Sequence, residues 1–474
     1  MKTMNVEVAI IGAGTSGLNA RRAALKGGAK RVVLIEDGPY GTTCARVGCM
    51  PSKLLIAAAD AAHEIKAAEG FGVHVKGSVE VDGPAVLQRV QRERDRFVGF
   101  VLEGVESIPA EQKLRGRARF VGPTKLEVAL EGSAEVVEVE AKAVVIATGS
   151  SSWHPPILDR AGDALLYNHT LFEQEDLPKS MAVVGTGVIG LELGQAMHRL
   201  GVRVSFFSLL DLLGPLTDPA VQAKAKAVLG AELDLHLPVR VSSVERTAEG
   251  VEVGWTDESG VERRDTFEKV LSAAGRRANV AGLGLETTGL ALAKTGVPLF
   301  DPLTMQCGDR PIFLAGDVTN DRPLLHEASD EGHMAGMNAA RYPNVEPFPR
   351  RTPMSVVFID PQMAMVGETH KSLEDSGRTY VIGEVSYDNQ GRARVMLKNK
   401  GLVRFYADPS SGVLLGVEMF GPRVEHTAHL MAWAIQSGLT VEEALERPFY
   451  HPVVEEGIRT GLQNTAAAIK KHKG

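Results

Sequence analysis

The sequence predicts a mixed α/β fold in which one strand–turn–helix–strand unit occurs twice and a separate α+β domain follows. The first copy begins at residue 6, where an apolar strand runs directly into a glycine-rich turn, and the second begins at residue 180. A proline-rich stretch at 343–353 marks the clearest change in composition. Beyond it, strands and helices alternate as in α+β domains. We expect strands at 355–359, 402–406 and 413–420 and helices at 425–437 and from 453 onward.

In the first copy, the turn G-A-G-T-S-G occupies 12–17 between a strand at 6–11 and a helix at 18–26, and a second strand at 31–35 ends in Glu36. Glycines in this register permit a tight turn and close approach of a pyrophosphate, which the helix N-terminus then faces. The carboxylate after the second strand is suited to bind a ribose hydroxyl. Because all these parts occur in order, we predict a Rossmann-like domain that binds an adenine dinucleotide.

The second copy carries the turn G-T-G-V-I-G at 185–190, then a helix that contains Glu192 and a strand at 202–207. This strand ends in Ser208 instead of an acid, and no arginine occurs between 208 and 215. The contact to a ribose 2′-hydroxyl found in many NAD sites is therefore not assured. We predict a second dinucleotide site whose preference between NAD and NADP stays open. The alternative is a helix that packs closely on its strand without a ligand.

Further strands return to these two units. A charged helix at 85–103 precedes strand-like segments that end at 143–150, and a similar final strand follows the second copy at 269–277. An apolar strand that begins at residue 312 ends in Asp317, and an Ala/Gly-rich helix follows at 326–341. Each of these strands is expected to join the sheet of a nucleotide domain.

Two of the three cysteines, Cys44 and Cys49, lie five positions apart in G-T-T-C-A-R-V-G-C-M-P-S-K at 41–53. In a regular helix this spacing separates the Cα atoms by roughly 8.6 Å, whereas a disulfide requires at most about 7 Å. A bond between them needs a bent or tightened backbone, for which Gly48 and Pro51 are suitable. The pair is a candidate redox-active disulfide. Cys307 lies in a loop-like stretch and is expected to be a surface or semi-buried thiol.

Composition excludes several other classes of protein. A formal charge of −7 gives no reason to expect nucleic-acid binding, which requires a basic face. Three cysteines are too few for a disulfide-stapled secreted scaffold, so we expect a cytoplasmic protein. We see no signal-peptide pattern and no apolar stretch near the roughly 18 residues that span a bilayer. Two thiols without a second pair are a weak zinc signature, so a metal-binding protein is the less favoured alternative and we predict no metal site.

These motifs together resemble the flavin-dependent pyridine nucleotide-disulfide oxidoreductases over essentially the whole chain, and the cysteine segment is most similar to that of the dihydrolipoamide dehydrogenase branch. Other similar segments are A-T-G-S at 147–150, G-V-I-G-L-E at 187–192, G-R-R-A-N at 275–279, A-G-D at 315–317 and H-P at 451–452 with Glu456. The resemblance implies two Rossmann-like dinucleotide-binding domains and a C-terminal α+β domain that builds a homodimer. The implied boundaries are 1–152 and 275–348 for the two parts of the FAD domain, 153–274 for the NAD(P) domain and 349–474 for the dimerisation domain.

The resemblance also implies roles for the redox residues. Cys49 would face the flavin, and Cys44 would exchange with substrate. Lys53, one helical turn after Cys49, would lie near flavin N5 and pair with Glu192, which keeps a positive charge where the reduced flavin becomes anionic. The residues expected to bind FAD are Gly12, Gly14, Ser16, Gly17, Glu36, Thr42, Thr43, Cys44, Lys53, Thr148, Gly149, Gly316 and Asp317. Those expected to bind NAD(P) are Gly185, Gly187, Val188, Ile189, Gly190, Ser208, Gly275 and Arg276.

His451 is the candidate acid and base. Thiol–disulfide exchange needs a thiolate and an acid for the departing sulfur, and an imidazole can supply both near neutral pH. Glu456 would fix the tautomer of the ring, as carboxylates do for other catalytic histidines. In the family this dyad reaches the cysteines of the other subunit.

The leading prediction is an FAD-dependent dihydrolipoamide dehydrogenase that oxidises a small dithiol or a lipoyl-domain substrate and reduces NAD. The alternative is an NAD(P)H-dependent reductase of another disulfide, a quinone or a thiophilic metal ion that uses the same redox centre. Two features differ from lipoamide dehydrogenases: the bulky pair Phe449 and Tyr450 precedes the histidine, and Val453 replaces a common threonine. Mercuric reductases and large thioredoxin reductases use a further C-terminal cysteine pair, which this chain lacks.

Overall fold

The computed structural model describes residues 2–473, and the chain forms two compact units. The first unit comprises Met1–Pro51, Val90–Trp153 and Arg276–Arg350, and the second comprises Ser52–Arg89, His154–Gly275 and Arg351–Gly474. Two helices, α3 (Cys49–Ala67) and α4 (Gly83–Glu106), continue from one unit into the other.

The first unit is built on a six-stranded sheet in which β1 pairs in parallel with both β2 and β5, and β5 pairs in parallel with β16. An antiparallel hairpin of β3 and β4 joins β2 to β5, and a two-stranded ribbon pairs β6 with β15. The strands are β1 (Lys2–Ile11), β2 (Val32–Glu36), β3 (Lys113–Phe120), β4 (Lys125–Leu130), β5 (Val136–Ile146), β6 (Ser150–Ser152), β15 (Arg276–Ala278) and β16 (Ile312–Leu314).

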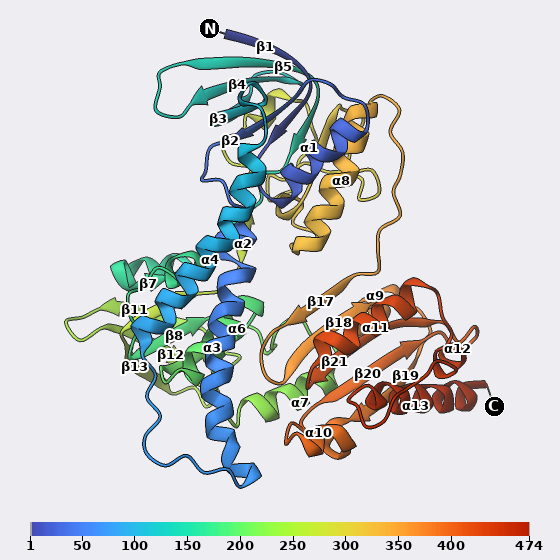
Figure 1. The fold of residues 1–474 in the computed structure, drawn as a ribbon. Coiled ribbons are helices and arrows are strands. Elements are labelled where there is room, and N and C mark those ends of the chain that lie inside the picture. Colours follow the sequence, from blue (N-terminus) through green and yellow to red (C-terminus); the bar gives the residue numbers. More distant parts are fainter. Residues whose placement is uncertain (1, 474) are drawn as a thin grey trace. The chain divides into compact units, whose positions relative to one another are not determined.

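Two helices of this unit, α1 (Thr15–Lys26) and α8 (Leu325–Arg341), lie side by side against the sheet (Figure 1). Successive strand residues point to opposite faces, so Val8 and Ile10 belong to the core beneath these helices whereas Ala9 belongs to the core on the other face. Both faces of β1 are therefore buried, as is usual for the strands of a parallel sheet.

The second unit contains a parallel sheet with the order β10-β9-β8-β14-β7 and an antiparallel sheet of β11, β12 and β13. The strands are β7 (Leu165–Leu166), β8 (Ser180–Val184), β9 (Arg203–Phe207), β10 (Asp234–His236), β11 (Val241–Arg246), β12 (Val251–Thr256), β13 (Glu262–Phe267) and β14 (Lys269–Ser272). The helices are α5 (Asn168–Leu171), α6 (Val188–Arg199) and α7 (Pro219–Leu229).

The C-terminal part of this unit is an antiparallel sheet with the order β17-β18-β21-β20-β19, and α11 and α13 pack against it. Its strands are β17 (Met354–Val357), β18 (Gln362–Gly367), β19 (Val381–Ser386), β20 (Leu402–Ala407) and β21 (Leu414–Gly421). Its helices are α9 (His370–Ser376), α10 (Gly391–Val395), α11 (Val424–Gln436), α12 (Val441–Leu445) and α13 (Glu456–Lys473). Short 3-10 helices elsewhere span Ala68–Phe71, Ala110–Gln112, Pro156–Ala164, Leu285–Thr287, Asp317–Thr319 and Tyr387–Asn389.

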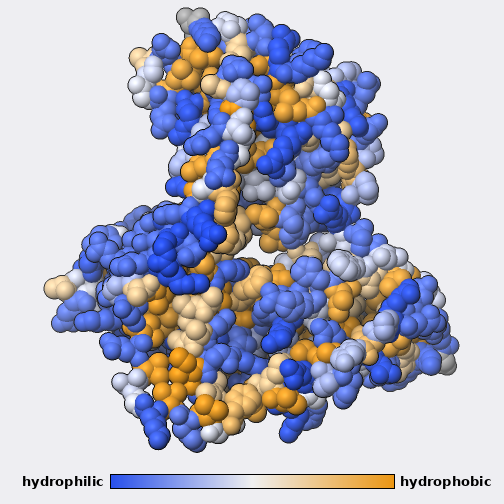
Figure 2. Space-filling model, viewed as in Figure 1, coloured by the Kyte–Doolittle hydropathy of each residue, from blue (hydrophilic) through white to orange (hydrophobic). Residues whose placement is uncertain are grey.

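The predicted fold class is confirmed, and the repeated unit and the C-terminal α+β domain are both present. The four domain boundaries stay a prediction. Among residues 2–473, no helix combines the length and the apolar composition needed to cross a bilayer. On the face drawn in Figure 2, hydrophilic residues cover most of the surface and apolar residues form small groups.

The expectation for Cys307 was wrong, because this thiol is fully buried. Gln306 forms a β-bridge with Phe313, and the Cys307 N–H donates to the carbonyl oxygen of Ile312 over 2.8 Å. The stretch that looked like a loop is thus folded back onto β16. Burial raises the pKa of the Cys307 thiol to about 12.

Candidate active site

A cavity of about 690 Å³ opens in the first unit at the carboxyl ends of its parallel strands. The turn after β1, the end of β2, the turn after β5 and the segment after β16 all line it, together with residues 42–49. Its volume lies in the range of ligand-binding pockets. Ligands of parallel α/β sheets bind at this edge, so the topology itself places the candidate cofactor site here.

The glycines of the first turn fit a bound dinucleotide. A Cβ on Gly12, whose φ is +108°, would lie 2.2 Å from the carbonyl oxygen of Ala147, and one on Gly17 would lie 1.9 Å from that of Gly12. These two positions therefore require glycine for close packing of strand and helix. A Cβ on Gly14 would meet no atom within 4 Å, although Gly14 lines the cavity. The space in front of Gly14 is what a pyrophosphate at the N-terminus of α1 needs.

The second turn repeats this arrangement. A Cβ on Gly185, whose φ is +112°, would lie 2.3 Å from the carbonyl oxygen of Ala273, and one on Gly190 would lie 2.0 Å from that of Gly185. A Cβ on Gly187 would meet nothing within 4 Å. Val188 and Ile189, with Gly190, form the first turn of α6. The residues of both turns thus fit dinucleotides, with one open glycine between two closely packed ones.

Glu36 is fixed at the end of β2 by backbone groups. One carboxylate oxygen accepts from the Ala13 N–H over 2.6 Å, and the other accepts from the Gly38 N–H over 2.7 Å. Each carboxylate oxygen can accept a second hydrogen bond. Since Glu36 lines the cavity, its remaining lone pairs are available to a ribose.

Asp317 also lines the cavity, in the segment after β16. Its carboxylate accepts from the Ser150 hydroxyl over 2.9 Å, and Arg276 donates to the same hydroxyl over 2.8 Å. Arg276 and Asp317 are also 3.9 Å apart as an ion pair, and burial lowers the pKa of the arginine despite that carboxylate. Ser150 is not among the residues predicted for the site, although it belongs to the A-T-G-S motif at 147–150.

Arg276, predicted for NAD(P), lies in the first unit beside two residues that line this cavity, whereas Gly275 ends the preceding segment of the second unit. Other predicted FAD residues lie together on the cavity wall. The members that line the cavity are Gly12, Gly14, Ser16, Glu36, Thr42, Thr43, Cys44, Thr148, Gly149 and Asp317. Gly316 immediately precedes Asp317 and has a φ of +81°.

The two cysteines line the same cavity. Helix α2 (Thr43–Val47) contains Cys44, and Cys49 begins α3. Gly48 separates the helices with a φ of −121° and a ψ of −113°, so the helix is interrupted between the cysteines, as a disulfide between them would require. Cys44 is half-buried and Cys49 is exposed. Thr42, with a φ of 61°, starts the segment and its hydroxyl accepts from the Ala45 N–H over 3.3 Å.

Lys53 and Glu192 form an ion pair in the second unit. The Lys53 ammonium lies 2.6 Å from a carboxylate oxygen of Glu192, and the side chains are 32% and 5% exposed. Lys53 lies four residues after Cys49 on α3, so the two positions share one side of that helix. The predicted ion pair between Lys53 and Glu192, which are 139 residues apart in the sequence, is therefore present in the structure.

His451 and Glu456 form the expected hydrogen-bonded pair. The ring Nδ1 lies 2.9 Å from one Glu456 oxygen, and the other oxygen accepts from the Val453 N–H over 3.1 Å. These two bonds hold the pKa of Glu456 below its usual value, the histidine contributing most. A carboxylate can only accept here, so Nδ1 is the donor, and in the neutral form of the ring the lone pair lies on Nε2. His451 is exposed, as is Tyr450 beside it, at 80%.

At the second dinucleotide turn, Ser208 does not point a free hydroxyl outward. Its Oγ donates to the carbonyl oxygen of Leu210 over 2.9 Å and accepts from the Leu210 N–H over 3.2 Å. Leu209 and Leu210 are 62% and 63% exposed. The segment after β9 thus presents apolar side chains where a cation would be needed for a 2′-phosphate.

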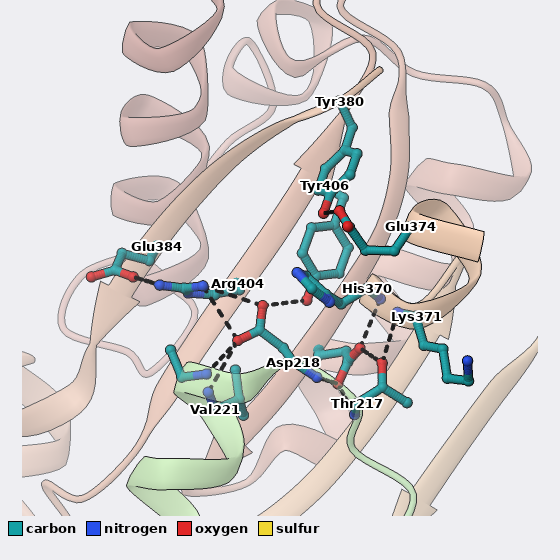
Figure 3. Close-up of polar contacts among 12 residues, drawn as sticks. Thr217, Asp218, Val221, His370, Lys371, Glu374, Tyr380, Glu384, Arg404 and Tyr406 are labelled. Atoms are coloured by element: carbon teal, nitrogen blue, oxygen red, sulfur yellow. Dashed lines mark hydrogen bonds and ion pairs between the residues drawn. The ribbon is translucent and has the colours of Figure 1, made fainter. Parts of the chain in front are cut away.

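Buried carboxylates anchor the far end of that segment (Figure 3). Glu418 of β21 accepts from the backbone N–H groups of Thr217 and Asp218 over 2.6 and 2.9 Å. Asp218 caps α7, and its second oxygen accepts from the Tyr406 hydroxyl over 3.0 Å and from Arg404 over 3.4 Å. Both carboxylates are fully buried, so these bonds fix the segment firmly within its unit.

Two family models match this chain. A model described as pyridine nucleotide-disulphide oxidoreductase matches residues 6–332, and one described as the dimerisation domain of the same family matches residues 353–461. A curated dihydrolipoyl dehydrogenase from Haloferax volcanii is 31% identical over 466 residues, covering 97% of this chain and 96% of the relative. A mercuric reductase from Shigella flexneri is also 31% identical, over 476 residues, covering 98% of this chain and 82% of the relative.

Solved structures match over nearly the full length. LpdA from Mycobacterium tuberculosis superimposes with a TM-score of 0.82 at 25% identity, covering 98% of this chain and 99% of that one. The flavoprotein disulfide reductase RclA from Escherichia coli superimposes with a TM-score of 0.81 at 21% identity, covering 97% and 99%, a likeness of fold. Since family models and a full-length relative agree, this chain belongs to the pyridine nucleotide-disulphide oxidoreductase family, whose members are flavoprotein disulfide oxidoreductases that use FAD and a pyridine nucleotide.

Proposed function

We propose that this protein is an FAD-dependent dihydrolipoamide dehydrogenase, which oxidises a protein-bound dithiol through a Cys44–Cys49 disulfide and transfers the electrons to NAD. The observation that carries the proposal is that both cysteines lie in the wall of the cavity that fits a dinucleotide. The curated dihydrolipoyl dehydrogenase, aligned over 97% of this chain, supports the same assignment.

The chemistry begins at Cys44. One substrate thiolate attacks the Cys44 sulfur, which forms a substrate–Cys44 disulfide and releases Cys49 as a thiolate. The second substrate thiolate then attacks the substrate sulfur of that bond, which closes the oxidised substrate and releases Cys44. FAD, held by the residues that line the cavity, would supply the two-electron oxidising chemistry that restores the disulfide and reduces NAD.

His451 removes the protons of the substrate thiols in this proposal. Its Nδ1–H is held by Glu456 over 2.9 Å, so the lone pair on Nε2 is the base, and the imidazolium that results returns a proton to a departing thiolate. Exposure of the ring leaves Nε2 open to a substrate that arrives from solvent. Lys53, held by Glu192, would supply positive charge on the helix that begins with Cys49.

The proposal includes a homodimer in which His451 of the partner subunit serves the cysteines of each chain. Support comes from the dimerisation-domain match at 353–461. Support also comes from large apolar side chains left exposed in that domain, with Trp433 and Leu430 of α11 at 72% and 45% exposure and Tyr450 at 80%. Exposed aromatic groups of this kind are typical of protein interfaces.

NAD is the proposed nicotinamide cofactor. Within 208–215 the only charged residue is Asp211, and its carboxylate pairs with Lys226 over 2.6 Å. A 2′-phosphate would therefore meet exposed leucines and a carboxylate instead of an unpaired cation, which disfavours NADP.

The second candidate is an NAD(P)H-dependent reductase of another disulfide, a quinone or a thiophilic metal ion. The mercuric reductase relative supports it, as does Tyr450, whose bulky exposed ring precedes the histidine where lipoamide enzymes have a small residue.

A substrate panel decides between these functions. Holoenzyme is assayed with dihydrolipoamide plus NAD or NADP, and in reverse with NADH or NADPH plus lipoamide, other disulfides, quinones and Hg²⁺. Rapid NADH formation from dihydrolipoamide, lost in Cys44→Ser, supports the dehydrogenase. No NADH formation, together with rapid NADPH oxidation by another acceptor, would overturn it.

A further inference from the structure

The short segment Phe358–Asp360, between β17 and β18, is held by one face of helix α6. Glu192 accepts from the Phe358 N–H over 2.9 Å. Gln195 accepts from the Asp360 N–H over 2.8 Å and donates to the Asp360 carbonyl oxygen over 2.9 Å. Arg199 donates to the same carbonyl oxygen over 3.1 Å and to the Asp360 carboxylate over 3.2 Å.

These three residues are spaced so that they share one side of the helix, and all three are buried. Buried groups that satisfy one another in this way have one favourable arrangement, because breaking any bond leaves an unpaired polar group. The backbone of Phe358 is therefore fixed relative to Glu192.

This backbone places the Phe358 ring against Lys53. The ammonium nitrogen of Lys53 lies 4.4 Å from the ring centroid, within the roughly 6 Å over which an aromatic face attracts a cation. The same nitrogen lies 2.6 Å from Glu192. Val357 and Ile359 on either side are buried, at 0% and 3%, whereas Phe358 is only half-buried. The ring is thus directed away from the core that its neighbours fill.

We infer that Phe358 is a positioning residue that holds the Lys53 ammonium between its aromatic face and the Glu192 carboxylate. Glu192 therefore has two roles, since one oxygen pairs with Lys53 and the other fixes the Phe358 backbone. The inference rests on the proposed function only in that Lys53 acts beside the flavin. A lysine restrained in one place stabilises negative charge on the reduced cofactor better than a mobile one, because it needs no reorganisation.

The test measures the two-electron reduction potential of the FAD-bound protein by spectroscopic titration against a reference dye. Phe358→Leu keeps the backbone N–H but removes the ring, and Phe358→Tyr keeps the ring as the matched control. We expect Phe358→Leu to disfavour reduced flavin about fivefold, a fall in potential of about 20 mV for a two-electron couple. Phe358→Tyr should keep the wild-type potential.

A double-mutant cycle separates this role from a merely structural one. In a Lys53→Met background, Phe358→Leu should leave the potential unchanged, because no ammonium remains to be held. An unchanged potential in the single variant, or a shift that persists without Lys53, would overturn the inference. The potential requires bound FAD but no dithiol turnover, so a negative substrate panel would overturn the proposed function and leave this result standing.

A second measurement uses the apoprotein. Acylation of Lys53 by a small amine-reactive ester, followed by peptide mass spectrometry, should be about threefold faster in Phe358→Leu than in Phe358→Tyr, since the ring shields the amine. Equal rates in the two variants would contradict the inference even where the leucine variant retains no FAD.

Discussion

Adding one methyl group at Gly14 should weaken cofactor binding, whereas adding one at Gly17 should destabilise the fold, although the two glycines belong to the same turn. Gly14 has a φ of −73° and a ψ of −172°, an extended conformation that alanine adopts freely. Its Cβ would meet no atom within 4 Å, whereas a Cβ on Gly17 would lie 1.9 Å from the carbonyl oxygen of Gly12. The methyl group of Gly14→Ala would project into the cavity proposed to hold FAD. The methyl group of Gly17→Ala would instead collide with the backbone where the turn packs on helix α1.

The expected magnitudes follow from these contacts. Gly14→Ala should change the free energy of unfolding of the apoprotein by less than about 0.5 kcal/mol, since the methyl touches nothing. It should weaken FAD binding by about 5-fold to 150-fold, because overpacking costs about 1–3 kcal/mol once a pyrophosphate fills that space. Gly17→Ala should destabilise the apoprotein itself by about 3 kcal/mol, because a backbone carbonyl must move.

The assay is a pair of titrations on apoprotein. FAD affinity is measured by fluorescence, and stability is measured by urea unfolding in the absence of cofactor. Gly99→Ala is the matched control. A Cβ at Gly99 would also meet no atom within 4 Å, but Gly99 does not line the cavity. FAD affinity should be unchanged in that control. Wild-type FAD affinity in Gly14→Ala would refute the reasoning, because the open space before this glycine would then not hold the pyrophosphate.

Three further predictions concern other parts of the chain. His451→Gln should retain FAD and its reduction by NADH but lose dithiol turnover about a hundredfold or more, measured by steady-state and stopped-flow kinetics, and near-normal turnover would contradict the role of base. Cys307 should resist alkylation by iodoacetamide at pH 8 until the protein is unfolded, because burial raises the pKa of its thiol to about 12. Peptide mapping measures the labelling, and an alkylated Cys307 in the native sample would contradict this prediction. Glu331 is fully buried and accepts from the Gly316 N–H over 2.8 Å while it pairs with Arg350 over 2.6 Å. Glu331→Gln should therefore destabilise the protein by about 2 kcal/mol and weaken FAD binding, and unchanged urea unfolding would be contrary to this expectation.

Short-range features were predictable because each follows from neighbouring residues. The glycine turns at 12–17 and 185–190 require a strand before them and a helix after them, and both are present. The break between the cysteines followed from the reach of a disulfide, and Gly48 supplies it. By contrast, the burial of Cys307 depends on a β-bridge between Gln306 and Phe313. This bridge is isolated, and the local sequence does not by itself predict which residues it joins.

Side-chain direction was the other limit, and Arg276 illustrates it. The motif G-R-R-A-N follows the last strand of the second nucleotide sheet, and the family resemblance implies that its arginine binds NAD(P). In the structure β15 pairs with β6 (Arg276 opposite Ser152), and the guanidinium donates to Ser150 beside Asp317. The observed contacts of the Arg276 side chain thus lie with Ser150 and Asp317 of the first unit, and its assignment to NAD(P) stays a prediction. The position of Phe358 was likewise not predictable from the sequence, because only the bonds from α6 to the backbone at Phe358 and Asp360 turn that ring toward Lys53.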